Sequence, residues 1–306
     1  MNKRITTCLF LFFFNGCLCV PVMADTACGE EGVWLQVLGS GGPELDDGRA
    51  SSGYVIWVDG KARILVDMGS GSLSRFEQSG ATINDLDVIL LSHLHVDHSN
   101  DLPVLVKASF FSGRDRDLSV YGPTGNPLMP STTSFVGLLF GPEGAYRYLS
   151  DYLDGTESYR IVPHDVSANG KIQQVVLDDS RYRITAVPVH HGPIPALAWR
   201  VQVDEKVIVF SGDMNNDNNT LTGLALKADL LVAHHAVPEG ATGVARNLHM
   251  PPSVIGHIAA SAGVTQLVLS HRMNRTLGRE TESGQYIRES YQGPMQFADD
   301  MQCFRP

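Results

Sequence analysis

Basic charge, cysteine and long apolar runs are all scarce in this sequence. Acidic residues outnumber Lys and Arg by 33 to 23, and the net charge of −10 disfavours non-specific binding to nucleic acid. Apart from a stretch at the N-terminus, no apolar run is long enough to span a membrane. No Ser/Gly tract, charge block, low-complexity run or internal repeat divides the chain. The lack of a linker or repeat predicts a single domain. The scarcity of basic charge favours substrates that are neutral, zwitterionic or masked by a metal.

The N-terminal stretch has the features of a secretory signal. Two basic residues precede an apolar run over residues 5–20, and Val22-Met23-Ala24 is a small-residue cleavage site of the usual kind. We predict a signal peptide over residues 1–24 and a mature domain over residues 25–306. The protein would be periplasmic or secreted, with no membrane attachment after cleavage and a net charge of −12. A lipid anchor on a cysteine of the peptide is an alternative, but the residues before each cysteine fit it poorly.

Only two cysteines remain once that peptide is removed. Cys28 and Cys303 lie one near each end of the mature chain. Export would place them in an oxidising compartment, where disulfides persist. We predict that the two cysteines pair, and two unpaired thiols on frayed ends are the alternative. Neither lies in a cluster of possible metal ligands, so thiolate coordination is not expected.

Apolar runs separated by turn signals predict a mixed α/β fold. Asp59-Gly60, between two strand-like runs, is a strong hairpin signal. Residues 124–164 give a poor signal, and we interpret them as a partly helical insertion, either a substrate-facing wall or a surface subdomain. The polar tail after Asn274 carries no readable pattern. Expected strands cover residues 34–38, 53–58, 63–66, 88–91, 118–123, 172–177, 182–189, 206–210, 228–232 and 264–270, and expected helices cover 71–87 with its exit, 102–111 and 254–262.

Four possible metal ligands stand within six residues. His93, His95, Asp97 and His98 directly follow a buried strand-like run, at the place where open α/β sheets carry their sites. Imidazole suits zinc, iron or manganese, and the carboxylate suits a hard or borderline cation. Isolated histidines are usually surface or core groups, but three so close together with an aspartate are rarely that. The ligands are too many for one tetrahedral ion, which favours two ions.

The spacing His-x-His-x-Asp-His resembles that of the metallo-β-lactamase superfamily of metallohydrolases. Later segments resemble further motifs of the superfamily in the same order, and some resemble its ribonuclease Z and arylsulfatase branch in particular. These segments are Asp67-Met68-Gly69, Leu118 to Pro123, His190 to Arg200, Phe210 to Asp213 and Leu267 to His271.

The resemblance implies a ligand set for two Zn²⁺ ions, with manganese or iron as alternatives. In this set Asp213 bridges both ions. His190 is the alternative to His191, and only one of the two is expected to ligate because adjacent residues on an extended chain face opposite ways. The first ion would be held by His93, His95, His191 and Asp213, and the second by Asp97, His98, His271 and the shared Asp213.

The resemblance also implies roles beyond metal binding. Asp67 would orient metal ligands, although an aspartate near a glycine is often only a turn or cap residue. Asp97 would also hold the nucleophile, and His249 would protonate the leaving group, with a loop histidine as the alternative. The ribonuclease Z branch has a His-Glu-Ala segment, whose Glu works in a proton relay, near the position of His234 and His235. No Glu occurs here, which leaves the roles of these two histidines open.

From the resemblance we expect the four-layer αββα sandwich of the superfamily. The implied activity is that of an exported dinuclear zinc hydrolase, which uses hydroxide shared by the ions to cleave phosphodiester or sulfate ester bonds of small substrates. A nucleic-acid substrate is not expected, because the chain is short between Trp199 and Asp213, where ribonuclease Z carries a tRNA-gripping arm. β-Lactam or lactone hydrolysis and a non-catalytic metal- or ligand-binding role are the alternatives. A homodimer is expected only by analogy.

Overall fold

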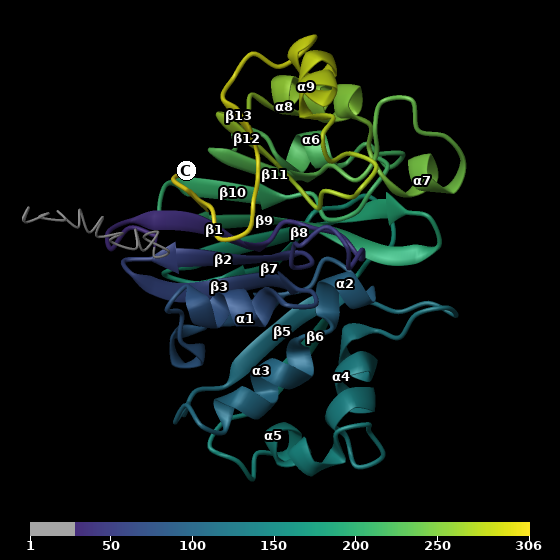
Figure 1. The fold of residues 1–306 in the computed structure, drawn as a ribbon. Helices are drawn as coiled ribbons and strands as arrows, with labels where there is room; N and C mark the ends of the chain where they lie inside the picture. The colour runs from purple at the N-terminus through teal and green to yellow at the C-terminus, as the bar shows by residue number, and fades with distance from the viewer. Residues whose placement is uncertain (1–27) are drawn as a thin grey trace, which may run out of the picture.

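The computed structural model describes residues 28–306, so the predicted signal peptide over residues 1–24 lies outside the described residues. Two mixed β-sheets pack face to face, and helices cover both outer faces (Figure 1). Within residues 28–306 each sheet has seven strands, in the orders β14-β1-β2-β3-β4-β5-β6 and β13-β12-β11-β10-β9-β8-β7. This arrangement is the expected αββα sandwich. No helix in this part of the chain combines the length and hydropathy needed to cross a bilayer.

In the first sheet an antiparallel meander of three strands continues into a parallel run from β3 to β6. The β2–β3 hairpin turns at Asp59 and Gly60, whose φ values of 48° and 72° suit the two-residue turn predicted for that dipeptide. Parallel strands end at the same edge, so the loops that follow β3 and β4 lie side by side. The strands are β1 (Val33–Gly39), β2 (Gly53–Val58), β3 (Lys61–Met68), β4 (Val88–Leu90), β5 (Leu118–Pro123), β6 (Ile161–Val166) and β14 (Cys303–Phe304).

The second sheet also combines an antiparallel half with a parallel half. β8 and β9 form a long hairpin that turns at Gly192 and Pro193, and β10 follows through a tight turn at Asp204 and Glu205. From β10 to β13 the strands are parallel, so their ends again meet at one edge. The strands are β7 (Gln174–Asp178), β8 (Tyr182–His191), β9 (Ile194–Val203), β10 (Lys206–Phe210), β11 (Leu230–His234), β12 (Gln266–Ser270) and β13 (Met295–Phe297).

The helices bury apolar side chains against the outer faces of the sheets. α1, α3 and α4 pack on the first sheet, and α6, α8 and α9 pack on the second. The helices are α1 (Ser72–Gln78), η1 (Ile83–Asp85), α2 (Val96–Ser99), α3 (Leu102–Ser109), α4 (Thr132–Phe140), η2 (Arg147–Leu149), α5 (Asp151–Asp154), α6 (Leu221–Leu224), α7 (Gly243–Leu248), α8 (Pro252–Ala262) and α9 (Glu280–Arg288).

The hydrophobic core between the two sheets fixes their relative position at the edge where the loops with the histidine and aspartate motifs lie. Strands of both sheets contribute to it, and Trp199, Phe210 and Tyr54 are among its largest buried side chains. Most strands are therefore buried on both faces, which explains why their sequences read as near-continuous apolar runs. Tyr54 is unusual in this core because its hydroxyl needs a polar partner, which it finds among the site residues.

Several elements lie where the sequence predicted none. The expected helix at 71–87 is α1 followed by the single turn η1. The insertion at 124–164 is partly helical, as predicted, but it ends in β6, an edge strand of the first sheet. The tail after Asn274 contains α9, β13 and β14, and the segment after His191 continues as β9.

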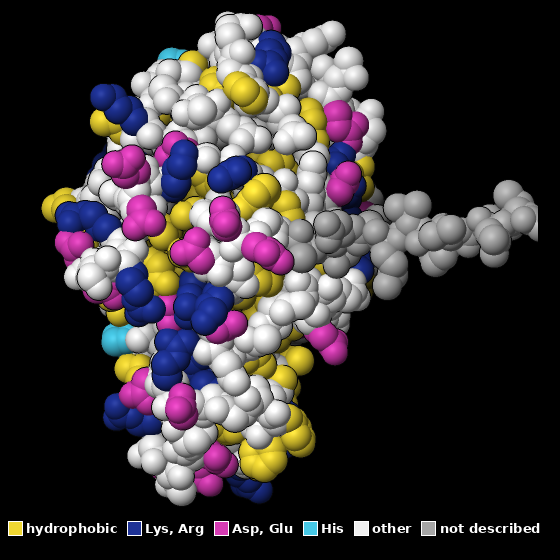
Figure 2. All heavy atoms as spheres, turned by 90° about the vertical axis from the view of Figure 1, so that its left-hand side faces the viewer, with side chains coloured by type: hydrophobic (Ala, Val, Ile, Leu, Met, Phe, Trp, Pro, Cys, Tyr) yellow, Lys and Arg dark blue, Asp and Glu magenta, His cyan; other side chains and the backbone are white. Residues whose placement is uncertain are grey.

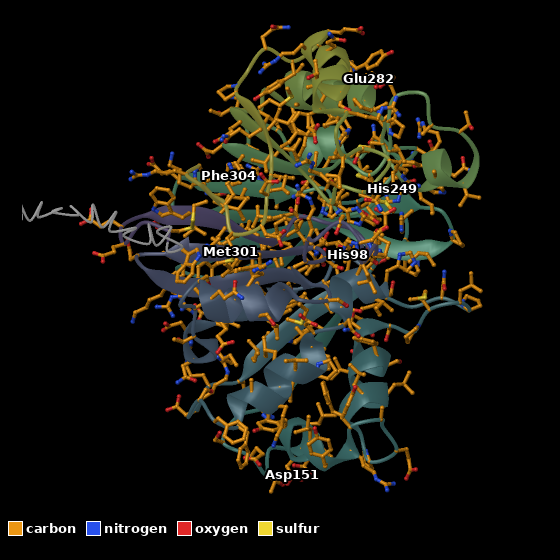
Figure 3. All side chains as sticks on the ribbon, in the orientation of Figure 1. His98, Asp151, His249, Glu282, Met301 and Phe304 are labelled. Carbon is orange, nitrogen blue, oxygen red and sulfur yellow. A yellow bond between two sulfur atoms is a disulfide. The ribbon has the colours of Figure 1, made fainter. Side chains whose placement is uncertain are left out.

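The two ends of the described chain are tied together. β14 pairs with β1, which places Cys303 opposite Gln36. Cys28 and Cys303 form a disulfide with their Cα atoms 5.7 Å apart, which confirms the predicted pairing. Figure 3 shows Phe304 on the left of the molecule, across from His98 on the right.

Candidate metal centre

Histidine and aspartate side chains cluster at the edge of the sandwich where loops of both sheets meet, near the labels His98 and His249 in Figure 3. They follow β4, β10, β12 and α7 or lie at the ends of β3, β8 and β11. Two glycines of the motifs permit the close approach. A Cβ on Gly69 would lie 2.0 Å from the carbonyl oxygen of Asp97, and one on Gly212, where φ is 58°, would lie 2.9 Å from Cβ of Ser92.

His93, His95 and His191 form the first ligand group, and one ring nitrogen from each lies within 4.8 Å of the other two. His191 Nδ1 lies 2.9 Å from the carbonyl oxygen of Leu248, which directs Nε2 to a point 3.4 Å from His95 Nδ1. Nε2 of His93 is buried and has no hydrogen-bond partner among the described residues. Three imidazole nitrogens therefore converge on one point. His190 instead is part-exposed, with Nδ1 3.8 Å from Asp217, so the structure brings His191 rather than His190 into the cluster.

Asp97, His98 and His271 form the second ligand group. Oδ2 of Asp97 lies 3.2 Å from His271 Nε2 and 3.5 Å from His98 Nε2. Nε2 of His98 makes no hydrogen bond within the described chain. His271 follows β12 with a φ of 53°, a left-handed conformation that is uncommon for a residue with a Cβ. The backbone thus turns sharply at the position where this ring joins the cluster.

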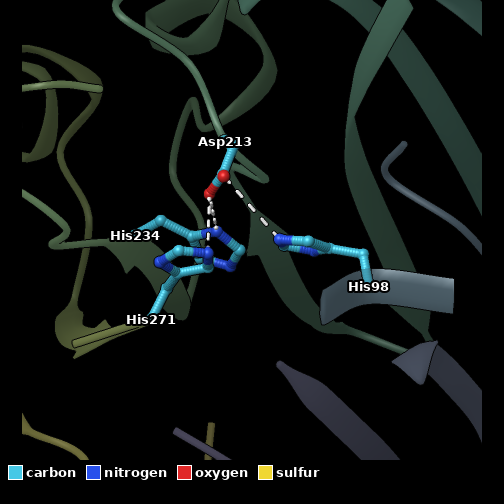
Figure 4. A group of neighbouring side chains, drawn as sticks. All are labelled: His98, Asp213, His234 and His271. Atoms are coloured by element: carbon cyan, nitrogen blue, oxygen red, sulfur yellow. Dashed lines mark hydrogen bonds and ion pairs between the residues drawn. The ribbon is translucent and has the colours of Figure 1, made fainter. Parts of the chain in front are cut away.

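Asp213 lies between the two ligand groups. Its Oδ2 is 3.7 Å from His98 Nε2 and 3.7 Å from His191 Nε2, and its Oδ1 is 3.4 Å from His271 Nε2. Figure 4 shows its contacts to His98, His271 and His234. The carboxylate therefore faces ligands of both groups at once.

Asp67 lies behind His98, on the side of its Nδ1 atom. It is buried and accepts hydrogen bonds from the backbone N–H and the hydroxyl of Ser92, both at 2.7 Å. Its Oδ2 also lies 2.8 Å from His98 Nδ1. A carboxylate in this position fixes the tautomer of the imidazole and leaves Nε2 available to a metal.

The charges of the cluster suit a cation. Burial lowers the pKa of every imidazole in the first ligand group, so these rings are neutral at pH 7. Burial opposes ionisation of Asp97, but His98 and His271 outweigh it and hold the pKa of that carboxyl well below its usual range. Burial also opposes ionisation of Asp213, but neighbouring histidines, His271 above all, hold the pKa of this carboxyl well below its usual range. In the second group burial opposes protonation, but the neighbouring aspartates raise the pKa of His98 and His271. Metal ligands need neutral nitrogens and ionised oxygens, so a cation bound there would displace the protons of these two rings.

The spacing of these atoms also fits divalent metal ions. Two ligands of one tetrahedral zinc ion lie about 3.4 Å apart, because each bond is about 2.1 Å long. The contacts within and between the ligand groups range from 3.2 to 3.7 Å. A metal would also satisfy the buried Nε2 atoms of His93 and His98, which make no hydrogen bond within residues 28–306. When bound, paired ions of this kind lower the pKa of a water and stabilise negative charge on an ester oxygen.

His249 also lies in the cluster. Its Nδ1 lies 3.8 Å from Asp213 Oδ1, and its ring centroid lies 5.5 Å from that of His191. Burial lowers the pKa of His249 to about 3, so the ring is neutral at pH 7. It therefore stands beside both ligand groups without a charge of its own.

His234 is a member of the cluster to which the sequence assigned no role. Its Nδ1 lies 2.8 Å from Asp213 Oδ1, whereas His235 faces the other side of β11 and lies 2.9 Å from the hydroxyl of Ser283. The alternation of side chains along an extended chain places the two histidines on opposite faces. The sequence alone does not predict which histidine faces the site, because both faces of β11 are buried.

Two mixed sheets with a His/Asp cluster at their shared edge define a metallo-β-lactamase type of fold and site. The chain belongs to this superfamily: the family model described as the beta-lactamase superfamily domain matches residues 62–272. The resemblance seen in the sequence is thereby confirmed.

Relatives and solved structures agree with this assignment. The chain is 29% identical to ribonuclease Z of Mycobacterium sp. (strain KMS) over 248 residues, 78% of this chain and 83% of that protein. It is also 29% identical to ribonuclease Z of Listeria monocytogenes serotype 4b (strain CLIP80459) over 242 residues, 69% of this chain and 78% of that protein. The metallo-β-lactamase-fold protein YhfI of Bacillus subtilis superposes with a TM-score of 0.69 at 21% identity, over 89% of this chain and 98% of that chain. The short form of human tRNase Z gives 0.68 at 20% identity over the same shares. The chain is thus a metal-dependent hydrolase that acts on ester bonds.

Proposed function

We propose that this chain is an exported dinuclear zinc hydrolase that cleaves phosphodiester or sulfate ester bonds of small substrates. The position of Asp213 carries the proposal, because its Oδ2 lies 3.7 Å from a nitrogen of each ligand group. One ion would be held by the first ligand group and Asp213, and the other by the second ligand group and Asp213. Imidazole and carboxylate ligands suit zinc, and they also accept manganese or iron.

Asp67, Asp97 and His249 would each have a further role in the reaction. Asp67 would hold His98 in the tautomer that presents Nε2. Asp97 would accept a hydrogen bond from the attacking water. His249 would pass a proton to the leaving oxygen, and because its ring is neutral at pH 7 it would first take up a proton during the reaction.

The short connection between β9 and β10 supports a small substrate. It is a tight turn at Asp204 and Glu205, in the place where ribonuclease Z carries its tRNA-gripping arm. The chain therefore lacks, at this place, the segment with which ribonuclease Z grips tRNA. Val96, between the ligands His95 and Asp97, is 68% exposed and would give an apolar contact at the mouth.

Acidic side chains beside the site support the same conclusion. The loop before β2 passes close to His271, where a Cβ on Gly42 would lie 3.0 Å from its ring. The loop then carries Glu44, Asp46 and Asp47. Carboxylates near the mouth repel the closely spaced phosphates of a nucleic acid more than a single ester group.

Export is supported by two independent features. Residues 1–24 have the pattern of a signal peptide. The Cys28–Cys303 disulfide suits an oxidising compartment. Fractionation of cells that express the full chain tests the localisation, and light scattering of the mature protein tests the proposed homodimer.

The function is tested by measuring metal content and turnover on residues 25–306. The panel contains an aryl phosphodiester, an aryl sulfate, a β-lactam, a lactone and a short RNA. We expect about two zinc ions per chain and a clear preference for the phosphodiester or the sulfate. Replacing His249 with Ala should abolish most ester turnover, whereas lactam hydrolysis, which depends less on leaving-group protonation, would largely survive. Preferred turnover of RNA or lactam, or less than one bound metal, would contradict the proposal.

A further inference from the structure

His234 touches the Asp213 carboxylate beside His271, whose ring stacks on that of His234 with centroids 4.8 Å apart. It is the last residue of β11 and is 2% exposed. Its Nδ1 lies 2.8 Å from Asp213 Oδ1, closer than the 3.4 Å that separates His271 Nε2 from the same oxygen (Figure 4).

The length of this contact distinguishes a hydrogen bond from shared metal binding. Two ligands of one zinc ion lie about 3.4 Å apart, whereas a charge-assisted N–H···O bond measures about 2.7 to 2.9 Å. His234 therefore donates its Nδ1 proton to Asp213 rather than sharing an ion with it. Oδ2 of the same carboxylate is left to face His98 and His191.

The other nitrogen of His234 is held from the opposite sheet. With the proton on Nδ1, Nε2 accepts a hydrogen bond from the hydroxyl of Tyr54 at 3.1 Å, and the hydroxyl oxygens of Tyr54 and Ser270 lie 2.9 Å apart. Tyr54 lies on β2 and is fully buried, with its ring 5.5 Å from that of Phe210. Ser270 directly precedes the ligand His271. A continuous row of buried polar groups thus runs from the bridging carboxylate across the gap between the sheets.

We propose that His234 is a positioning residue that fixes the rotation of the Asp213 carboxylate, and that Tyr54 in turn fixes His234. This role rests on the dinuclear centre proposed above. A residue that touches no metal would then set how tightly the centre holds its ions. Partners that orient metal ligands typically contribute about 10- to 100-fold to metal affinity.

Three substitutions separate the parts of this row. His234→Leu removes the donor, whereas His234→Asn keeps an N–H group near the position of Nδ1. Tyr54→Phe removes only the hydroxyl and keeps the packed ring. His235→Leu is the matched control, because His235 is the next residue, is equally buried and hydrogen-bonds to Ser283 on the other side of the strand.

The measurement is zinc affinity by competition with a chromogenic chelator, together with the absorption spectrum of the cobalt-substituted protein. We expect His234→Leu to lose about 10- to 100-fold in affinity and to change the cobalt spectrum. His234→Asn should recover most of the affinity, and Tyr54→Phe should lose a smaller part. His235→Leu should match the wild type in both measurements even if the metal-free protein unfolds at a lower temperature.

Three results would overturn the role. Wild-type affinity and spectrum in both His234→Leu and Tyr54→Phe would show that the row does not position Asp213. Loss of one whole ion in His234→Leu and His234→Asn, with Tyr54→Phe unchanged, would make His234 a ligand. Failure of the wild type itself to bind more than one metal would refute the proposed centre, a result that is visible before any variant is compared.

Discussion

Replacing Asp67 with Asn is a sharp test of how the centre is organised, because it changes one charge and very little shape. Asp67 has a φ of 53°, a left-handed conformation that Asn also tolerates, so the backbone is not strained by the change. The amide oxygen can still accept the hydrogen bond from the backbone N–H of Ser92, which Oδ1 now accepts at 2.7 Å.

The amide nitrogen then replaces Oδ2, which lies 2.8 Å from His98 Nδ1. An amide nitrogen donates and does not accept, so it would favour the tautomer of His98 that carries the proton on Nε2. That nitrogen is the one that faces Asp97 and Asp213, where a metal needs a lone pair. We expect metal affinity to fall by about 10- to 100-fold, which corresponds to about 1.4 to 2.7 kcal/mol.

The assay is chelator competition for zinc, followed by turnover of an aryl phosphodiester at saturating zinc. Asp59→Asn is the matched control, since Asp59 also has a positive φ, of 48°, but lies in the β2–β3 turn away from the site. Thermal unfolding of the metal-free proteins shows whether either variant disturbs the fold. Wild-type zinc affinity in Asp67→Asn would refute the claim that this carboxylate sets the tautomer of His98.

The remaining predictions concern ligand choice, the disulfide and acid stability. His191→Ala should lose tightly bound zinc while His190→Ala keeps it, as metal analysis after dialysis would show; the reverse would exchange their roles. Cys303→Ser frees Cys28 and should lower the free energy of unfolding by about 2 to 5 kcal/mol, measured in urea; an unchanged midpoint would contradict this. Burial opposes ionisation of Asp87, but hydrogen bonds from a guanidinium and a tyrosine hydroxyl hold its pKa below the usual range. Asp87→Asn should therefore cost about 2 kcal/mol at pH 7, and this difference should fade as the pH drops below about 4; a pH-independent difference would contradict it.

Most of the cluster could be predicted because its residues directly follow apolar strand runs. His93, Asp213 and His271 each come within a few residues after a buried strand, and Asp67 lies at the end of one. Parallel strands end at one edge, so residues after different strands meet there. His191 was reached differently, from the spacing of the motif that it resembles. The rule that neighbours on an extended chain face opposite ways indicated only that one of His190 and His191 would ligate. The fold followed from the same motifs, since their order along the chain matches that of a known architecture.

The elements that were missed have no local pattern strong enough to reveal them. β13 has three residues and β14 has two, and each exists because it pairs with a strand far away in sequence. α9 is mostly polar, and its buried positions, Ser283, Gly284 and Ile287, include only one large apolar side chain. His234 escaped assignment because both faces of β11 are apolar, so its orientation depends on tertiary packing.

The disulfide between Cys28 and Cys303 turns nearly the whole described chain into a covalent ring. A single cut of the backbone anywhere between these residues opens the ring but does not separate two fragments. A nicked molecule would therefore run as one species on a non-reducing gel and as two on a reducing gel. The disulfide also keeps both ends of the described chain on the side of the molecule opposite to the site. In Figure 3, Phe304 near the C-terminus lies on the left and His249 of the site lies on the right. A tag, a solid support or a fused domain attached at the C-terminus would thus leave the mouth of the centre open to its substrate.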